Sequence, residues 1–228
     1  MLGQAAMAGT GTDRSKTGDR GAPTGRPRGL RAPAGRRPHN AMSTFLIATG
    51  LVALAEIGDK TQLLSLMLAA RYRQPWTIIL GILVATLANH ALAAAAGGLV
   101  AGLVDPRLLR WVVALGFAAM AVWALRPDTL EEGSVPGGRR LGVFGVTLLA
   151  FFLAEMGDKT QVATVALASQ HAGELVQVTL GTTAGMMIAN VPAVFAGSWL
   201  LQRLPLRWIR RAAAACFLAL AILVAAAP

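Results

Sequence analysis

Two short polar segments of this chain carry the residues that could do chemistry. Residues 55–62 read AEIGDKTQ and residues 154–161 read AEMGDKTQ, so the two segments differ at a single position. Each brings a glutamate, an aspartate and a lysine into an apolar stretch long enough to cross a bilayer. Because ionisable groups are costly at that depth, the segments predict an ion or proton pathway, and their repetition strengthens the prediction.

The acidic residues of these two motifs are the candidate metal ligands: Glu56, Asp59, Glu155 and Asp158. Four carboxylates in one place could not all stay charged and unpaired. Lys60 and Lys159 add two positive charges to the four negative ones, which leaves a formal −2 that one divalent cation would balance. Protons could neutralise the carboxylates when the metal leaves, so the motifs favour metal/proton exchange.

The remaining motif residues narrow the choice of metal. Around the carboxylates we expect supporting polar side chains: Lys60, Thr61, Gln62, Lys159, Thr160, Gln161 and Asn190. Carboxylate, hydroxyl and amide oxygens suit hard cations such as Mn²⁺, Ca²⁺ or Mg²⁺. No cysteine or histidine adjoins either motif, which argues against dedicated zinc or copper handling, and no resident cofactor is expected. His90 could relay protons, although a polar residue filling a helix contact is the simpler interpretation for both His90 and Asn190.

A purely structural role for the motif is the competing hypothesis. In a continuous helix Glu56 and Lys60 would be spaced i,i+4 and could form an ion pair that only fixes helix packing. Two copies of the motif, each followed by threonine and glutamine, make this interpretation the weaker one.

The elements that must position these residues are membrane-spanning helices. The chain is 55% hydrophobic and only 14% charged, too apolar for a soluble domain of 228 residues. Six apolar segments can be drawn, at roughly 43–70, 76–103, 108–125, 142–170, 174–201 and 207–226. The fold class predicted is therefore an all-α polytopic membrane protein with six transmembrane helices.

The first and fourth segments carry the motifs near their middle. In a helix, Glu56 and Asp59 would project from the same face, and Glu155 and Asp158 would repeat that arrangement. The glycine inside each motif permits either a close approach of helices or a local break that frees backbone carbonyls.

The repeat extends beyond the motifs. Gly81 and Gly97 of the second segment match Gly181 and Gly197 of the fifth. Residues 42–126 and 141–228 are then two repeats of three helices each. Because three is an odd number of spans, the second repeat enters the membrane in the opposite sense to the first. Inverted repeats are typical of transporters and place the site near the midplane where the halves meet.

Most charged residues outside the motifs lie in the N-terminal tail and in the connections between the apolar segments. Residues 1–41 form a basic tail with a charge of +6 out of the net +10, and we expect it to be disordered. Translation starting at Met42 is an equally good expectation. The tail lacks the aromatic residues and the fold of a nucleic-acid-binding segment. Arginines concentrate in the connections after the first, third and fifth segments, including the central loop 127–140, so these connections are predicted to be cytoplasmic.

At residues 56–62 and 155–161 the chain resembles the paired signature of the transmembrane-protein-165-like family of divalent cation/proton exchangers. That family includes Golgi manganese/calcium transporters and bacterial manganese exporters. The resemblance covers roughly residues 42–226 and implies six helices in two inverted repeats, with the acidic residues of both motifs as cation ligands. The compact loops and the alanine- and arginine-rich composition favour the bacterial manganese-exporter branch.

The function predicted is export of Mn²⁺ across the inner (cytoplasmic) membrane in exchange for protons, by a multi-pass protein. Its partners would be the divalent cation, protons and the lipid bilayer, with no nucleic acid. A Ca²⁺/H⁺ exchanger with the same site is the main alternative. A passive channel is disfavoured because so many carboxylates should hold a divalent ion too tightly for rapid conduction. No enzyme is predicted, since no nucleophile–base pair adjoins the motifs. The oligomeric state and the proton-carrying carboxylate stay open.

Overall fold

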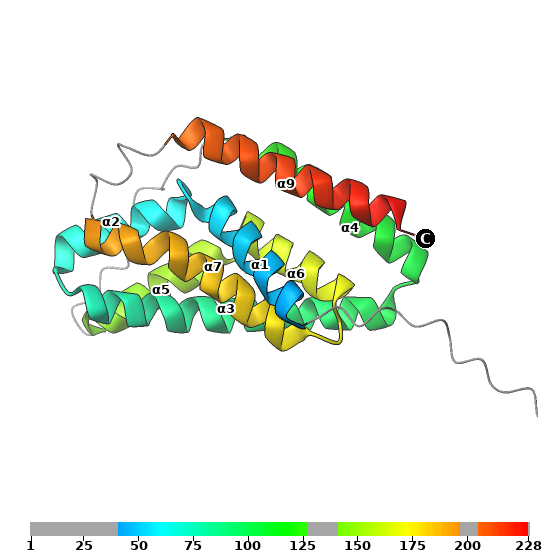
Figure 1. The fold of residues 1–228 in the computed structure, drawn as a ribbon. Helices are drawn as coiled ribbons and strands as arrows, with labels where there is room; N and C mark the ends of the chain where they lie inside the picture. The colour runs from blue at the N-terminus through cyan, green and yellow to red at the C-terminus, as the bar shows by residue number, and fades with distance from the viewer. Residues whose placement is uncertain (1–40, 127–140, 197–204, 228) are drawn as a thin grey trace, which may run out of the picture. The chain divides into compact units, whose positions relative to one another are not determined.

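The computed structural model describes residues 41–126, 141–196 and 205–227, and the regular structure in these residues is α-helical (Figure 1). The described helices belong to one compact unit, His39–Pro228. The expected basic tail, apart from its last residue, and the expected central loop 127–140 lie outside the described residues.

The first motif interrupts a helix. Helix α1 (Ala41–Glu56) ends at the motif glutamate, helix α2 (Lys60–Tyr72) begins at the motif lysine, and the two are bent by 70°. Between them Gly58 has φ +83°, a left-handed conformation that glycine adopts without steric strain. A continuous helix over 43–70 is therefore the wrong prediction, and the alternative of a local break is confirmed.

The second motif repeats the break. Helix α5 (Gly142–Glu155) ends at its glutamate, helix α6 (Lys159–Gln170) begins at its lysine, and Gly157 has φ +73°. A helix end leaves backbone N–H or C=O groups without partners inside the helix. The two breaks therefore place polar backbone beside the only acidic residues of these apolar segments.

Four longer helices complete the described fold: α3 (Pro75–Leu103), α4 (Pro106–Ala124), α7 (Leu175–Ala196) and α9 (Leu206–Ala226). Proline at the first position of α3 and α4 suits a helix start, because no N–H is needed there. All four are long and apolar enough to cross a membrane, and the bent pair α1–α2 makes up to five candidate spans among the described residues. The chain is thus a multi-pass helical membrane protein.

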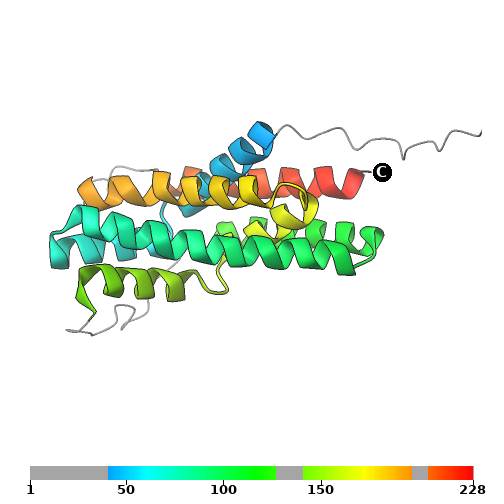
Figure 2. The same ribbon diagram turned by 90° about the horizontal axis from the view of Figure 1, so that it is seen from below.

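Each broken helix packs on a long helix from the other half of the chain (Figures 1 and 2). Helix α3 lies along α5 and α6, while α7 lies along α1. A Cβ on Gly81 of α3 would lie 2.8 Å from Thr147 Cβ, and one on Gly181 of α7 would lie 2.9 Å from Ala48 Cβ. These glycines allow the close backbone approach on which helix association in membranes depends.

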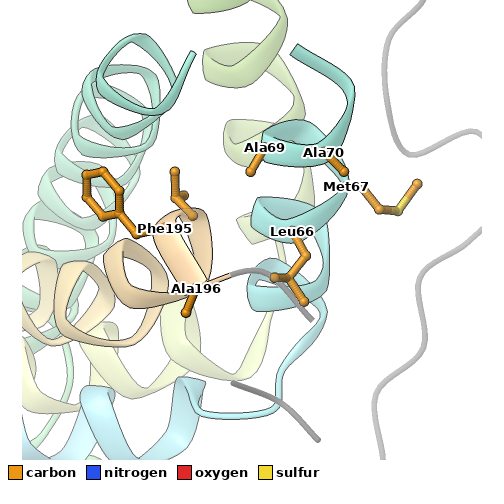
Figure 3. Close-up of a pocket in the computed structure, with 7 residues that line it drawn as sticks. Leu66, Met67, Ala69, Ala70, Phe195 and Ala196 are labelled. Atoms are coloured by element: carbon orange, nitrogen blue, oxygen red, sulfur yellow. The ribbon is translucent and has the colours of Figure 1, made fainter. Parts of the chain in front are cut away.

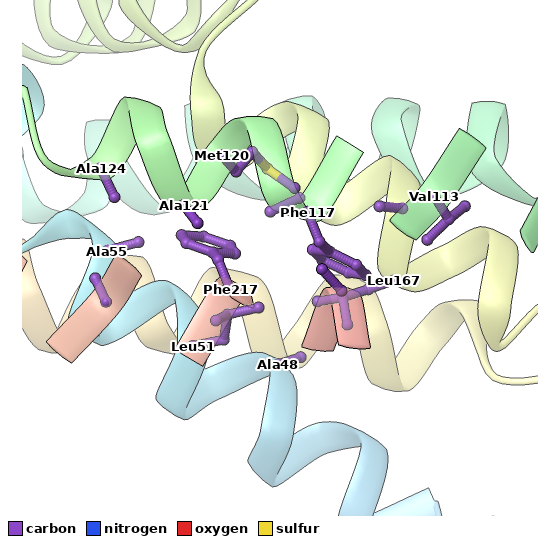
Figure 4. Close-up of a cluster of buried hydrophobic side chains, with 14 of the residues drawn as sticks. Ala48, Leu51, Ala55, Val113, Phe117, Met120, Ala121, Ala124, Leu167 and Phe217 are labelled. Carbon is purple, nitrogen blue, oxygen red and sulfur yellow. The ribbon is translucent and has the colours of Figure 1, made fainter. Parts of the chain in front are cut away.

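Helices α4 and α9 pack together, and their contact is centred on two aromatic rings. Phe117 and Phe217 are buried and stack with ring centroids 6.4 Å apart. Figure 4 shows them among side chains of α1 and α6, with Leu51, Ala55 and Leu167 nearby. The α4–α9 pair therefore rests against both broken helices.

Candidate functional site

The two breaks bring carboxylates of both motifs together. Glu56 closes α1, Asp59 precedes α2 and Asp158 precedes α6. One carboxylate oxygen of each lies within 4.8 Å of the others, and the three side chains are buried. Both aspartates sit at a helix N-terminus, where the helix dipole stabilises negative charge.

Glu155, the fourth acidic residue of the motifs, is placed differently. It is fully buried at the end of α5, and it is not part of the group of three carboxylates. Neither of its carboxylate oxygens has a hydrogen-bond partner among the described residues. Because a buried carboxylate without a partner is strongly unfavourable, this position calls for a proton or a cation.

The two lysines pair across the motifs. Lys60 Nζ lies 3.3 Å from Asp158 Oδ1, and Lys159 Nζ contacts Asp59 Oδ1. The local Glu56–Lys60 ion pair of the structural hypothesis is replaced by pairs between the two halves, because the break removes the i,i+4 geometry. Each lysine thus neutralises the aspartate of the other motif.

The motif threonines converge on one glutamate. Thr61 Oγ1 donates to Glu56 Oε2 at 2.7 Å, and Thr160 Oγ1 donates to Glu56 Oε1. One threonine comes from each motif, so Glu56 is held by both halves of the chain. The two hydroxyl groups orient the carboxylate and add oxygen atoms to the cluster.

The motif glutamines span the breaks. The side-chain oxygen of Gln62 accepts from Gly58 N at 2.8 Å, and that of Gln161 accepts from Gly157 N at 2.7 Å. The Gln62 amide donates to the backbone oxygen of Ala189 in α7 at 2.9 Å, and the Gln161 amide donates to Asn89 Oδ1 in α3. Each glutamine therefore ties the glycine of a break to the long helix beside it.

Polar residues on the long helices support this arrangement. Asn190 accepts from Ser65 Oγ at 2.8 Å and donates to the backbone oxygen of Met186 at 3.1 Å, so it joins α7 to α2. His90 is buried, and its Nδ1 lies 3.5 Å from Thr183 Oγ1. The sequence reasoning missed Ser65 and the role of Asn89, although both are polar residues inside apolar segments.

Two pockets lie between the described helices. One, of about 440 Å³, lies between α2 and the end of α7, and its lining is apolar, with Leu66, Met67 and Phe195 among its residues (Figure 3). The other, of about 320 Å³, adjoins the second break and is lined in part by Asn89, Met156 and Gln161. Neither pocket is lined by a carboxylate of the motifs, so neither contains the candidate site, which is the group of Glu56, Asp59 and Asp158.

Comparison with known proteins identifies the family. Residues 44–132 and 143–227 match the family described as "Divalent cation/proton antiporter GDT1", and the chain belongs to it. It is 50% identical over 186 residues to a "Putative manganese exporter" of Vibrio cholerae, covering 82% of this chain and 92% of that protein. A GDT1-like protein of Synechocystis is 26% identical over 183 residues, with 72% of this chain and 87% of that protein covered. No solved structure gives a significant match.

The family match confirms the resemblance found at the two motifs. This chain is a helical membrane protein of a family of cation/proton antiporters, which is a family of transporters.

Proposed function

We propose that this protein exports Mn²⁺ in exchange for protons through a site built by both motifs. The observation that carries the proposal is the convergence of Glu56, Asp59 and Asp158, whose oxygens lie within 4.8 Å of one another although they come from motifs about 100 residues apart. Divalent cations that prefer oxygen ligands bind in such clusters. Glu155 supplies a further buried carboxylate next to the second break.

The charge of the site supports exchange rather than permanent binding. Four carboxylates and two lysines leave a formal −2, which one divalent cation balances and which protons balance when the cation has left. The cation and the protons would then compete for the same oxygens, which is the basis of coupled counter-transport. The name of the Vibrio cholerae relative favours manganese as the cation.

We further propose six spans in two inverted repeats, with α1–α2 and α5–α6 each forming one broken span. Matched contacts support this: Lys60 with Asp158 mirrors Lys159 with Asp59, and Phe117 stacks on Phe217, 100 positions later. Broken helices at a repeat interface are the usual place of transporter binding sites. Alternating access would follow from one repeat moving against the other.

The arginine-rich connections support a cytoplasmic-membrane location in which export runs from the arginine-rich side to the other. Three arginines of this set lie among the described residues: Arg71 in the last turn of α2, Arg73 directly after α2, and Arg126 after α4.

The test is transport by the purified full chain in proteoliposomes that contain a pH dye, with Mn²⁺ and Ca²⁺ added in parallel. Proton movement coupled to Mn²⁺ alone is expected, whereas coupling to Ca²⁺ alone would make the protein a calcium exchanger. Coupling to both would make it a broad divalent exchanger. Metal flux without a pH change would overturn the exchange mechanism in favour of a channel.

A further inference from the structure

The two cross-motif ion pairs are alike in chemistry but differ in exposure. The Lys60 side chain is 26% exposed and its partner Asp158 is 2% exposed, whereas the Lys159 side chain is 5% exposed and Asp59 is fully buried. One pair is therefore within reach of water, while the other is enclosed.

The surroundings of the two breaks differ as well, although each ion pair takes one residue from each break. A Cβ on Gly58 would lie 2.9 Å from Leu206 Cδ2, so α9 covers the first break. A Cβ on Gly157 would meet no atom of the described residues within 4 Å, and the neighbouring Met156 is exposed. At its glycine, the second break, which carries Asp158, is thus less covered than the first, which carries Lys60. It is the exposure of the Lys60 side chain that makes its pair with Asp158 the accessible one.

From this asymmetry we propose that Lys60 is a displaceable counter-cation: its ammonium group holds Asp158 when the site is empty and is displaced when a divalent cation enters. The inference rests on the proposed function and specifies the order of events within it. The enclosed pair of Lys159 and Asp59 stays together, while the positive ion at Asp158 is exchanged.

The physical reason is competition for one carboxylate. An ammonium 3.3 Å from Asp158 Oδ1 occupies the position where a cation would bind, so the cation must compensate for the lost ion pair. A partly exposed ion pair contributes little, and a free lysine side chain can regain water, so a divalent ion can displace it. Because Lys60 stays tethered beside the site, it can return to Asp158 and help to release the cation.

The first experiment measures Mn²⁺ binding to the purified full chain in detergent, from the loss of the free Mn²⁺ signal in electron paramagnetic resonance. Lys60→Gln removes the competing charge, and Lys60→Arg keeps it. Arg71→Gln removes one positive charge at an exposed position outside the site and serves as the matched control.

We expect the Kd for Mn²⁺ to fall about tenfold in Lys60→Gln, as it would if the empty site were closed by Lys60 about nine-tenths of the time. Mn²⁺ turnover in proteoliposomes should fall at the same time, because release loses its competitor. An unchanged or raised Kd in a folded Lys60→Gln protein would overturn the proposal, as would equal tightening in Arg71→Gln.

The second experiment uses the unmodified protein. Lys60 and Lys159 are the two lysines after residue 41, so acetic anhydride labelling of each can be assigned by mass spectrometry, with an added lysine-containing peptide as the reference. Saturating Mn²⁺ should increase labelling of Lys60 relative to that peptide and leave Lys159 unchanged. Electron paramagnetic resonance verifies that Mn²⁺ saturates the protein. Unchanged or decreased labelling of Lys60 under that condition would overturn the proposal that Mn²⁺ displaces Lys60 from Asp158.

Failure of this inference and failure of the proposed function give different results. If the unmodified protein neither binds nor transports Mn²⁺, the proposed function is wrong. If it does both, while Lys60→Gln binds Mn²⁺ no more tightly, the function stands and the role of Lys60 is wrong.

Discussion

Lys159 and Asp59 form a buried ion pair although they belong to different copies of the motif. The pair joins the start of α6 to the residue that precedes α2, so it links the two broken helices directly. Breaking a buried pair leaves a buried charge without its partner, so this contact should stabilise the fold as well as the proposed site.

We expect Lys159→Met to destabilise the protein by about 3–5 kcal/mol, because Asp59 would keep its charge in a buried position. Thermal unfolding in detergent measures the effect. Adding Asp59→Asn to Lys159→Met should restore part of the loss, since the orphaned charge is removed. A double variant as unstable as the single one would contradict this account.

The carboxylates lead to a prediction for transport. Glu56→Gln and Glu155→Gln keep side-chain size but each remove a negative charge from the buried acidic set. Mn²⁺ efflux should fall to the level of liposomes without protein in both variants, while membrane insertion and the elution profile stay normal. Normal Mn²⁺ efflux in both variants would rule out the assigned site.

The glutamines that span the breaks give a third prediction. Gln161→Leu removes the acceptor of Gly157 N–H and the donor to Asn89. The Gly157 contact is exposed and the Asn89 contact is partly buried, so the loss should be about 1 kcal/mol, with lower thermal stability and slower transport. Gln62→Leu should act in the same way through Gly58 and Ala189.

A double-mutant cycle separates the two contacts of Gln161. Asn89→Ala alone should reproduce part of the loss, and the combination with Gln161→Leu should cost less than the sum of the two single variants. Strict additivity would show that the Gln161–Asn89 contact carries no coupling.

The two motif glycines should differ in their tolerance of alanine. Gly157→Ala should cost only the strain of φ +73°, roughly 1–2 kcal/mol, because a Cβ there would meet no atom of the described residues within 4 Å. Gly58→Ala adds a contact with Leu206 and should be the more destabilising substitution. In a Leu206→Ala background the difference between the two substitutions should shrink. Thermal unfolding of Gly58→Ala and Gly157→Ala, each with and without Leu206→Ala, measures it.

Much of this protein was predictable from sequence because membrane spans depend on local composition. A helix in lipid needs about 20 apolar residues, so α3, α4 and α9 begin and end within two residues of the predicted segments. The doubled motif also identified the family, and it named the charged residues that the structure brings together at the breaks.

The tertiary structure decided how those residues meet. Spacing rules for a helix placed Glu56 and Asp59 on one face, but they hold only in a continuous helix, and the left-handed glycines end that continuity. Once α1 and α5 stop at their glutamates, each lysine reaches the aspartate of the other motif, and Glu155 stays apart from the three clustered carboxylates. Which break is covered by Leu206 and which is open depends on how α9 packs, a contact between distant parts of the chain that no local pattern encodes.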